Sequence, residues 1–204
     1  MPTRTFSPAD FSFSGFGRLL MLGAALSLAA ARPVSASVVA PMPFATLVGD
    51  ASAIFRGEVI DVRSEWRQLR DERVIVTVVL FKVERVLKGT ASATLALETL
   101  GGTIGDTSMV IPGMPQFVVG DRDVLCIERA QAALFPVLGA TQGRFRILTD
   151  RAGSQRVVFN DGRPVGAVTQ IGRAAVLVSS SPIAPLGLSA FESTIEQEVA
   201  RGRR

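Results

Sequence analysis

Few side chains in this sequence could do chemistry, because its 204 residues include no His and only one Cys. Catalysis by Ser-His-Asp or Cys-His sets is therefore excluded as such sites are normally built, and so are zinc, copper and haem sites with His ligands. The single Cys126 can form neither a disulfide within the chain nor a cysteine-bound iron–sulfur cluster. It stands between Leu125 and Ile127, which favours a buried, unreactive thiol.

Carboxylates are the remaining candidates for acid–base chemistry or metal binding. Asp121 and Asp123, with Asp106 nearby in the sequence, could offer oxygen ligands to Ca²⁺. The further ligands of a recognisable calcium loop are missing, and Gly120-Asp121 is a common turn pair, so we expect no metal and no other cofactor. A carboxylate pair for glycoside hydrolysis could be drawn from four residues, as in any chain of this length: Glu98, Asp106, Asp121 and Glu128. We therefore assign no catalytic residue.

Three glycines, Gly101, Gly102 and Gly105, follow a predicted strand, as they would in a phosphate-binding loop. No helix pattern and no Gly-Lys-Ser/Thr sequence comes after them, so the helix N-terminus and the Lys of such a site are missing. We interpret the three residues as glycines of tight turns.

A charged segment, residues 63–73, carries acidic side chains between four arginines: Arg63, Arg67, Arg70 and Arg73. This mixture predicts a solvated connection with surface ion pairs. The only Trp of the chain, Trp66, lies in this segment beside Arg67. Because Trp and Arg often anchor protein interfaces, we predict that Trp66 and Arg67 contact an extracytoplasmic protein partner, with packing of Trp66 over the fold as the alternative.

Residues 1–36 have the three-part layout of a secretory signal peptide. An uncharged apolar run, residues 19–31, follows a start with two arginines. As a helix this run reaches about 20 Å, less than the roughly 30 Å core of a bilayer. Val34 and Ala36 occupy the −3 and −1 positions of a cleavage site, so we expect cleavage after Ala36 and an extracytoplasmic protein, periplasmic or secreted, without membrane attachment. A retained short membrane anchor is the alternative.

The net charge of +4 overstates the charge of the part that folds. Cleavage after Ala36 would remove three arginines and one aspartate, and three of the remaining arginines stand at the C-terminal end: Arg201, Arg203 and Arg204. The folded body is therefore near neutral. Because nucleic-acid binding needs a basic face, we do not expect a nucleic-acid partner.

The pattern of apolar residues predicts a mainly β fold. After an extended lead-in at residues 37–52, about seven strands are expected among these eight stretches: residues 54–62, 74–86, 93–99, 108–111, 123–129, 134–141, 143–149 and 155–160. Because no helical pattern separates them, we expect a small antiparallel barrel of OB-like, Greek-key type over residues 53–160.

The rest of the chain is expected to form an irregular connection, residues 161–188, and one C-terminal α-helix with a basic tail, residues 189–204. Ser189 and Glu192 have the spacing of a capping box at the start of this helix. An apolar stripe at four-residue spacing predicts the face that packs on the sheet: Phe191, Ile195 and Val199.

Residues 53–89 join a strand with an apolar-x-Gly-x-Val pattern to a long strand that ends in Val-Leu-Lys-Gly. This stretch resembles the first strands of netrin-like and tissue-inhibitor-of-metalloproteinases modules, which are OB-type barrels. Those inhibitors bind the metal of their target through an N-terminal Cys, where this chain would begin with Ser37.

A longer pattern resembles a group of secreted bacterial proteins without assigned activity. The resemblance covers about residues 47–147 and rests on these segments: residues 101–105, 110–117, 120–121, 124–125 and 139–147. It implies no catalytic residue.

These observations lead to one main functional hypothesis, a secreted, non-enzymatic binding or interaction module for a protein or an envelope component. The alternatives are an inhibitor of a secreted metalloprotease, a hydrolase that uses carboxylates or a metal on the same barrel, and a structural envelope component.

Overall fold

The computed structural model describes residues 40–128, 134–173 and 183–203. The expected signal peptide, residues 1–36, and its cleavage position after Ala36 lie outside the described residues, as do residues 174–182 of the expected irregular connection. No helix within the described ranges has both the length and the apolar character needed to cross a membrane.

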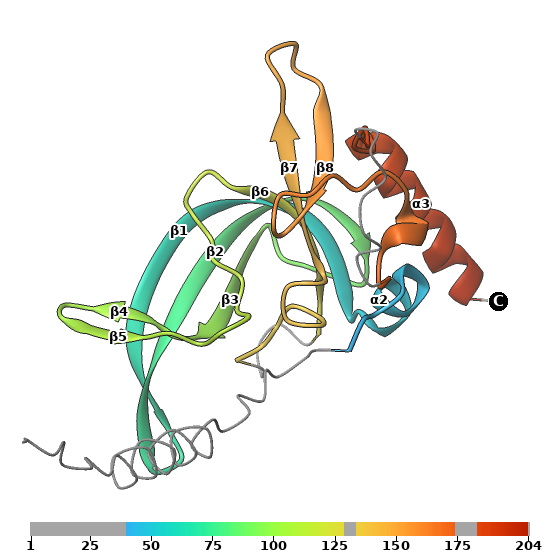
Figure 1. The fold of residues 1–204 in the computed structure, drawn as a ribbon. Coiled ribbons are helices and arrows are strands. Elements are labelled where there is room, and N and C mark those ends of the chain that lie inside the picture. Colours follow the sequence, from blue (N-terminus) through green and yellow to red (C-terminus); the bar gives the residue numbers. More distant parts are fainter. Residues whose placement is uncertain (1–39, 129–133, 174–182, 204) are drawn as a thin grey trace, which may run out of the picture. The chain divides into compact units, whose positions relative to one another are not determined.

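The fold is mainly β, as the sequence predicts, and is built on one six-stranded antiparallel sheet in the order β3-β2-β1-β6-β7-β8 (Figure 1). Two further strands, β4 and β5, form a separate ribbon. The strands are β1 (Ala53–Leu69), β2 (Glu72–Lys88), β3 (Thr94–Leu100), β4 (Gly102–Ile104), β5 (Thr107–Met109), β6 (Arg122–Ile127), β7 (Arg144–Thr149) and β8 (Gln155–Phe159). The helices are α2 (Phe44–Asp50), the short 3₁₀ helix η1 (Val168–Gln170) and α3 (Leu188–Gly202).

Strands β1 and β2 form a hairpin with 17 residues on each side, so the connection expected at residues 63–73 is in fact the tip of this hairpin. Cross-strand pairing continues to the last pair, Leu69 with Glu72, and only Arg70 and Asp71 join the strands. Arg70 takes a positive φ of 53° to make this tight turn. The charged side chains are compatible with a strand because residues alternate between its two faces.

The helices differ from the expectation in number and in capping. Helix α2 lies inside the stretch expected to be an extended lead-in, where Phe44, Leu47 and Val48 are buried. Within the described residues the fold therefore has two α-helices, where the sequence predicts one. Helix α3 begins at Leu188 after Gly187, and no side chain caps its first turn, so the predicted capping box of Ser189 and Glu192 does not form.

No pairing among the described strands closes the sheet into the expected barrel, and β3 and β8 are its two edges. The strand expected at residues 134–141 is replaced by a single bridge from Val137 to Ile127 and a hydrogen bond from the Leu100 N–H to the Leu134 carbonyl, 3.1 Å long. Pro136 has no N–H to contribute to a ladder there. The chain then turns through residues 138–143 before β7.

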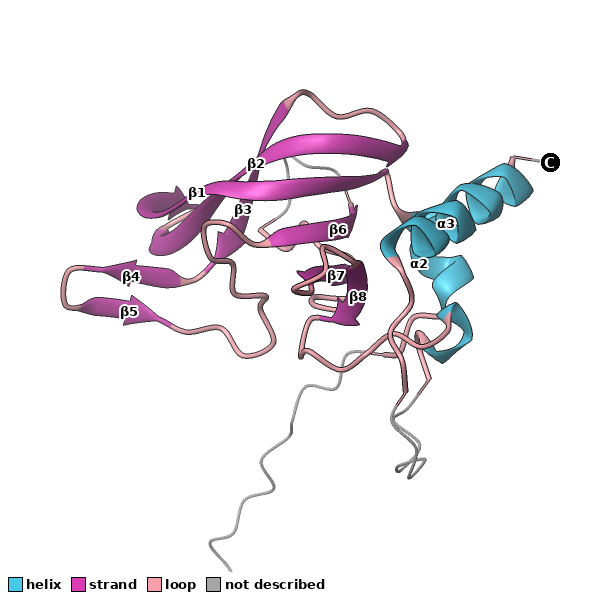
Figure 2. Ribbon diagram, turned by 90° about the horizontal axis from the view of Figure 1, so that it is seen from above, coloured by secondary structure: helices cyan, strands magenta, loops and turns pink. Residues whose placement is uncertain are grey.

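The sheet carries three clusters of buried apolar residues, one on each of its two faces and a smaller one at Val74, Val76 and Val78 of β2. Figure 2 shows helices α2 and α3 together at one end, with the β4–β5 ribbon at the other. The face covered by the helices, here called the helix face, buries these residues among others: Ile54, Val124, Phe145, Phe191, Ile195 and Val199. The predicted helix stripe is thus confirmed. The opposite face, here called the loop face, buries Phe55, Phe81, Leu97 and Leu125 together with Phe117 from the loop before β6.

Candidate functional site

The two predicted partner contacts, Trp66 and Arg67, are neighbours on β1 and therefore point to opposite faces of the hairpin. Trp66 is half-buried, and the guanidinium carbon of Arg73 lies 4.4 Å from its ring centroid. Arg67 forms ion pairs with Glu65 and Glu98, at N–O distances of 2.9 and 2.8 Å. Three of the four arginines of this segment thus lie on strands, and Arg70 stands in the turn between them. Partner contact through Trp66 and Arg67 stays a prediction.

The carboxylates that sequence reasoning considered for hydrolysis lie on different elements. Glu98 is on β3, in its ion pair with Arg67. Asp106 is exposed in the turn between β4 and β5, and Glu128 is exposed after β6. Within the described part of the chain, no group of three or more His, Cys, Asp and Glu side chains is placed to hold a metal ion.

Asp121 and Asp123 converge on a buried arginine, Arg144 of β7, whose side chain is only 2% exposed. One guanidinium nitrogen of Arg144 lies 2.8 Å from Asp121 Oδ2 and 3.0 Å from Asp123 Oδ2. The guanidinium also donates to the Gln116 carbonyl and stacks on Phe117, with its central carbon 4.1 Å from the ring centroid. Because Arg144 pairs with both carboxylates, the three side chains form an ion-pair centre on the loop face.

Asp123 is fully buried, and this burial raises the pKa of its carboxyl group to about 6, against the attraction of Arg144 and Arg146 and with a smaller contribution from the repulsion of Asp121. In the described structure, Asp123 Oδ1 and Arg144 Nε have no hydrogen-bond partner. The ionised form of Asp123 is therefore only partly compensated.

Cys126 is buried on the helix face, as predicted. Burial raises the pKa of its thiol to about 12, with a small opposing effect of Lys88. Because the thiolate is the reactive form, this side chain is chemically inert at neutral pH.

The three glycines after β3 shape the β4–β5 ribbon. Gly105 lies in its turn, as predicted, whereas Gly101 joins β3 to β4 and Gly102 is the first residue of β4. Gly101, Gly102 and Gly105 all have positive φ angles. The Thr77 hydroxyl donates to the Gly101 carbonyl at 2.7 Å, and the Thr103 N–H donates to the Ser64 hydroxyl at 3.2 Å. These bonds fix the ribbon against the β1–β2 hairpin.

A cavity of about 240 Å³, here called the hairpin pocket, lies between the loop face, the β4–β5 ribbon and residues 110–117. Five hydroxyl groups line it: Ser64, Thr77, Thr99, Thr103 and Ser108. Its apolar walls include Met109, Ile111, Met114 and Phe117. None of its lining residues has an ionisable side chain, so the pocket offers hydrogen bonds and apolar contact but no acid or base.

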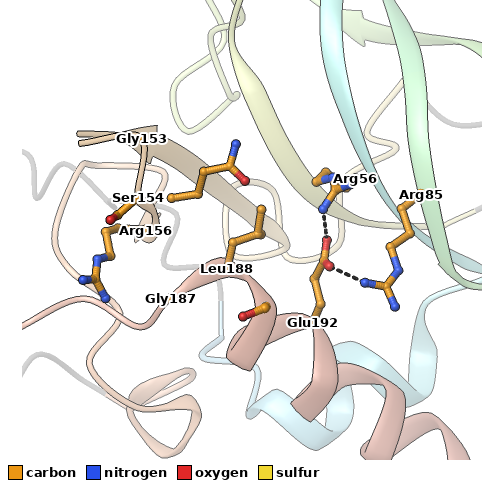
Figure 3. A pocket seen from close by; sticks show the side chains of 10 residues that line it. Arg56, Arg85, Gly153, Ser154, Arg156, Gly187, Leu188 and Glu192 are labelled. Carbon is orange, nitrogen blue, oxygen red and sulfur yellow. Dashed lines mark hydrogen bonds and ion pairs between the residues drawn. The ribbon is translucent and has the colours of Figure 1, made fainter. Parts of the chain in front are cut away.

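A second cavity, of about 540 Å³ and here called the arginine cleft, lies between the β7–β8 turn, the start of α3 and the β1–β2 hairpin. Figure 3 shows Glu192 between Arg56 and Arg85, and Arg156 on the opposite side. Glu192 is only 2% exposed and accepts hydrogen bonds from Arg56 at 2.8 Å and from Arg85 at 2.6 Å. Two of the three cleft arginines are therefore already paired with a carboxylate that ties α3 to the sheet.

Sequence reasoning missed Arg144, Glu192 and the pocket hydroxyls. One signal was present for Arg144, because Arg144 and Arg146 alternate with the apolar Phe145 and Ile147 and so must share one face of β7. Nothing local distinguished Ser64 or Thr77, which meet only through the pairing of β1 with β2.

Comparisons with protein families, curated proteins and solved structures found no match to this chain.

Proposed function

We propose that this chain is an extracytoplasmic, non-enzymatic protein-binding module, and that the hairpin pocket receives an uncharged side chain of its protein partner. The observation that carries the proposal is the chemistry of the pocket, which combines five hydroxyl groups with apolar walls and has no ionisable group. Acid–base catalysis needs a titratable side chain within hydrogen-bond reach of the substrate. Binding needs only complementary shape and hydrogen bonds.

The size of the pocket favours a side chain over a complete small molecule. Its volume of about 240 Å³ is below the roughly 300–1,000 Å³ of typical small-molecule sites. Met109 and Met114 in its walls are flexible and polarisable, so they can adapt to the shape of an inserted group.

The surroundings of the pocket also favour a protein partner. The segment that forms its wall continues into a rim with three exposed valines: Val110, Val118 and Val119 are 78%, 65% and 59% exposed. Exposed apolar side chains next to a polar pocket are the composition expected of a protein-binding surface.

We also propose that the sheet is an OB-like barrel that is open on one side. Its support is the continuous antiparallel order β3-β2-β1-β6-β7 and the contacts of residues 134–137, which bond to Leu100 at the end of β3 and to Ile127 at the end of β6. Such a barrel is a scaffold that supports many functions, so the binding proposal rests on the pocket.

The proposal is tested with peptides selected from a random phage-display library against the purified chain, and with two variants of the β4–β5 ribbon. Ser108→Trp fills the pocket, whereas Thr107→Trp places the same ring on the neighbouring residue, which is exposed and does not line the pocket. We expect Ser108→Trp to weaken binding of the selected peptides at least tenfold in fluorescence polarisation and Thr107→Trp to leave it unchanged. A library that yields no specific peptide, or peptides that bind both variants equally well, would overturn the proposal.

A further inference from the structure

The wall of the hairpin pocket is joined to the sheet through one buried guanidinium. We propose that the Asp123–Arg144 pair is an acid-favoured latch on this wall: protonation of Asp123 favours the closed position of the segment that carries Gln116 and Phe117. This latch regulates the shape of the hairpin pocket. Only its biological role rests on the proposed function.

The geometry of the latch follows from the contacts of Arg144. On the side of the wall, its guanidinium bonds to the Gln116 carbonyl and to Asp121, and stacks on the Phe117 ring. On the side of the sheet, it bonds to Asp123 at 3.0 Å and to the Asn160 side chain at 3.3 Å. Gln116 and Phe117 line the pocket, so any change in their position changes the pocket directly.

The end of the segment has a second attachment that limits how far it can move. The Val59 N–H donates to the Asp121 carbonyl and the Gly120 N–H donates to the Val59 carbonyl, both at 2.8 Å. These backbone bonds keep residues 120–121 on β1. Opening therefore concerns the part that rests on Arg144, residues 110–119.

The positive and negative charges around Asp123 cancel only while Asp123 itself is ionised. They are Arg144 and Arg146 from β7 and Asp121 from the loop before β6, and the other neighbouring strand places Gly57 opposite Asp123. This cancellation of charge does not supply the hydrogen bonds that a buried carboxylate needs, because Asp123 Oδ1 has no donor in the described structure. A buried ionised oxygen that no protein donor reaches favours either protonation or access of water.

The direction of the effect follows from linkage. In the closed state the pKa of Asp123 is about 6, and in an opened state that lets water reach the carboxyl group it returns toward its ordinary value of about 4. The closed state therefore binds the proton more tightly. Closing is favoured as the pH falls from 6 toward 4, and this gain is lost as the pH rises through 6. Between pH 7.5 and pH 5 the ratio of closed to open molecules should rise about tenfold.

Hydrogen exchange measured by mass spectrometry tests the latch without any ligand. We expect opening of residues 110–119, after correction for the intrinsic pH dependence of exchange, to be about tenfold more frequent at pH 7.5 than at pH 5 in the full chain. Asp123→Asn should remove this pH dependence. Asp71→Asn, in the exposed turn between β1 and β2, is the matched control and should keep it.

A second measurement covers the case in which Asp123→Asn does not fold. In the unmodified chain, the corrected exchange of residues 110–119 should titrate with a midpoint near pH 6, and that of the β7–β8 turn should not. A flat profile in residues 110–119, or the same profile in Asp123→Asn, would overturn the latch. Neither result would affect the peptide-binding test, which is made at one pH.

Discussion

Glu192 shows how one buried side chain can connect elements that are distant in sequence. Its two carboxylate oxygens accept hydrogen bonds from Arg56 of β1 and Arg85 of β2, so the N-terminal half of α3 is tied to the central hairpin. Arg85 also pairs with Glu196 one turn further along the helix, at 2.6 Å. The spacing of Ser189 and Glu192 predicts a capping box, but the side chain of Glu192 is used across the interface instead.

Removing the charge of Glu192 should therefore destabilise the fold. Glu192→Gln leaves two arginines without their buried partner, and we expect a loss of about 2 kcal/mol in the free energy of unfolding. Glu196→Gln removes an ion pair of the same helix that is about half exposed, and should cost less than about 1 kcal/mol. Urea denaturation measures both as a lower midpoint with an unchanged slope. Equal costs for the two variants would show that Glu192 is no stronger a tether than a surface pair.

Predictions for single residues are right where the burial of a side chain depends on its neighbours in the sequence. They are incomplete where the role of a side chain depends on a partner that is distant in the sequence. The run Leu125-Cys126-Ile127 predicts a buried thiol, because its apolar neighbours must be inside. Asp121 and Asp123 stood out as a pair, but their role depends on Arg144, which lies about twenty residues further along the chain and meets them only because β6 pairs with β7.

At the scale of elements, the β4–β5 ribbon depends on Gly102 more than on Gly105. A Cβ added at Gly102, where φ is +144°, would lie 2.5 Å from Ser64 Oγ and 2.6 Å from Thr77 Oγ1. Gly105 has a φ of +56° and open space around the same position. The two glycines thus separate the effect of close packing from that of backbone conformation.

Gly102→Ala should lower the free energy of unfolding by about 2 kcal/mol, because it combines strain with a clash against the hairpin. Gly105→Ala should cost about 1 kcal/mol through its left-handed backbone alone. Chemical denaturation gives both values. Only Gly102→Ala should also weaken peptide binding in the hairpin pocket. If both variants lost stability and binding equally, the contact of Gly102 with Ser64 and Thr77 would have no special role.

The sequence predicts most strands of this fold but not the full length of the longest hairpin, the one formed by β1 and β2. Its apolar residues predict the first half of β1, residues 54–62, and nearly all of β2, residues 74–86, and the structure confirms a strand at both. The tip was missed because its turn, Arg70-Asp71, has no glycine, and the signal for a tight hairpin turn is normally Gly or Asn-Gly. The expectation of an extended lead-in at residues 37–52 rests on Pro41 and Pro43, but these prolines precede helix α2 and do not interrupt it.

At the scale of the whole molecule, closure of the sheet is the property that local patterns could not decide. The apolar residues at 134–141 predict a strand, and such a strand would have extended the sheet toward a closed barrel. The chain makes a single bridge there, and the outer edge of β8 is bonded by residues 163–165 and 186–187. These contacts depend on the path of the chain in three dimensions, which residue periodicity does not encode.

Export and cleavage of the chain are predicted from its N-terminal residues. The apolar run at residues 19–31 is shorter than a bilayer core, and small residues precede the expected cleavage position after Ala36. When the full chain is expressed in a bacterial host, intact-mass spectrometry of the extracytoplasmic fraction should find a protein that begins at Ser37. Ala36→Arg places a large charged side chain at the cleavage position and should retain the leader, whereas Ser37→Ala should be processed normally. A full-length product in the membrane fraction would instead favour a retained anchor, and would place the hairpin pocket at a membrane surface.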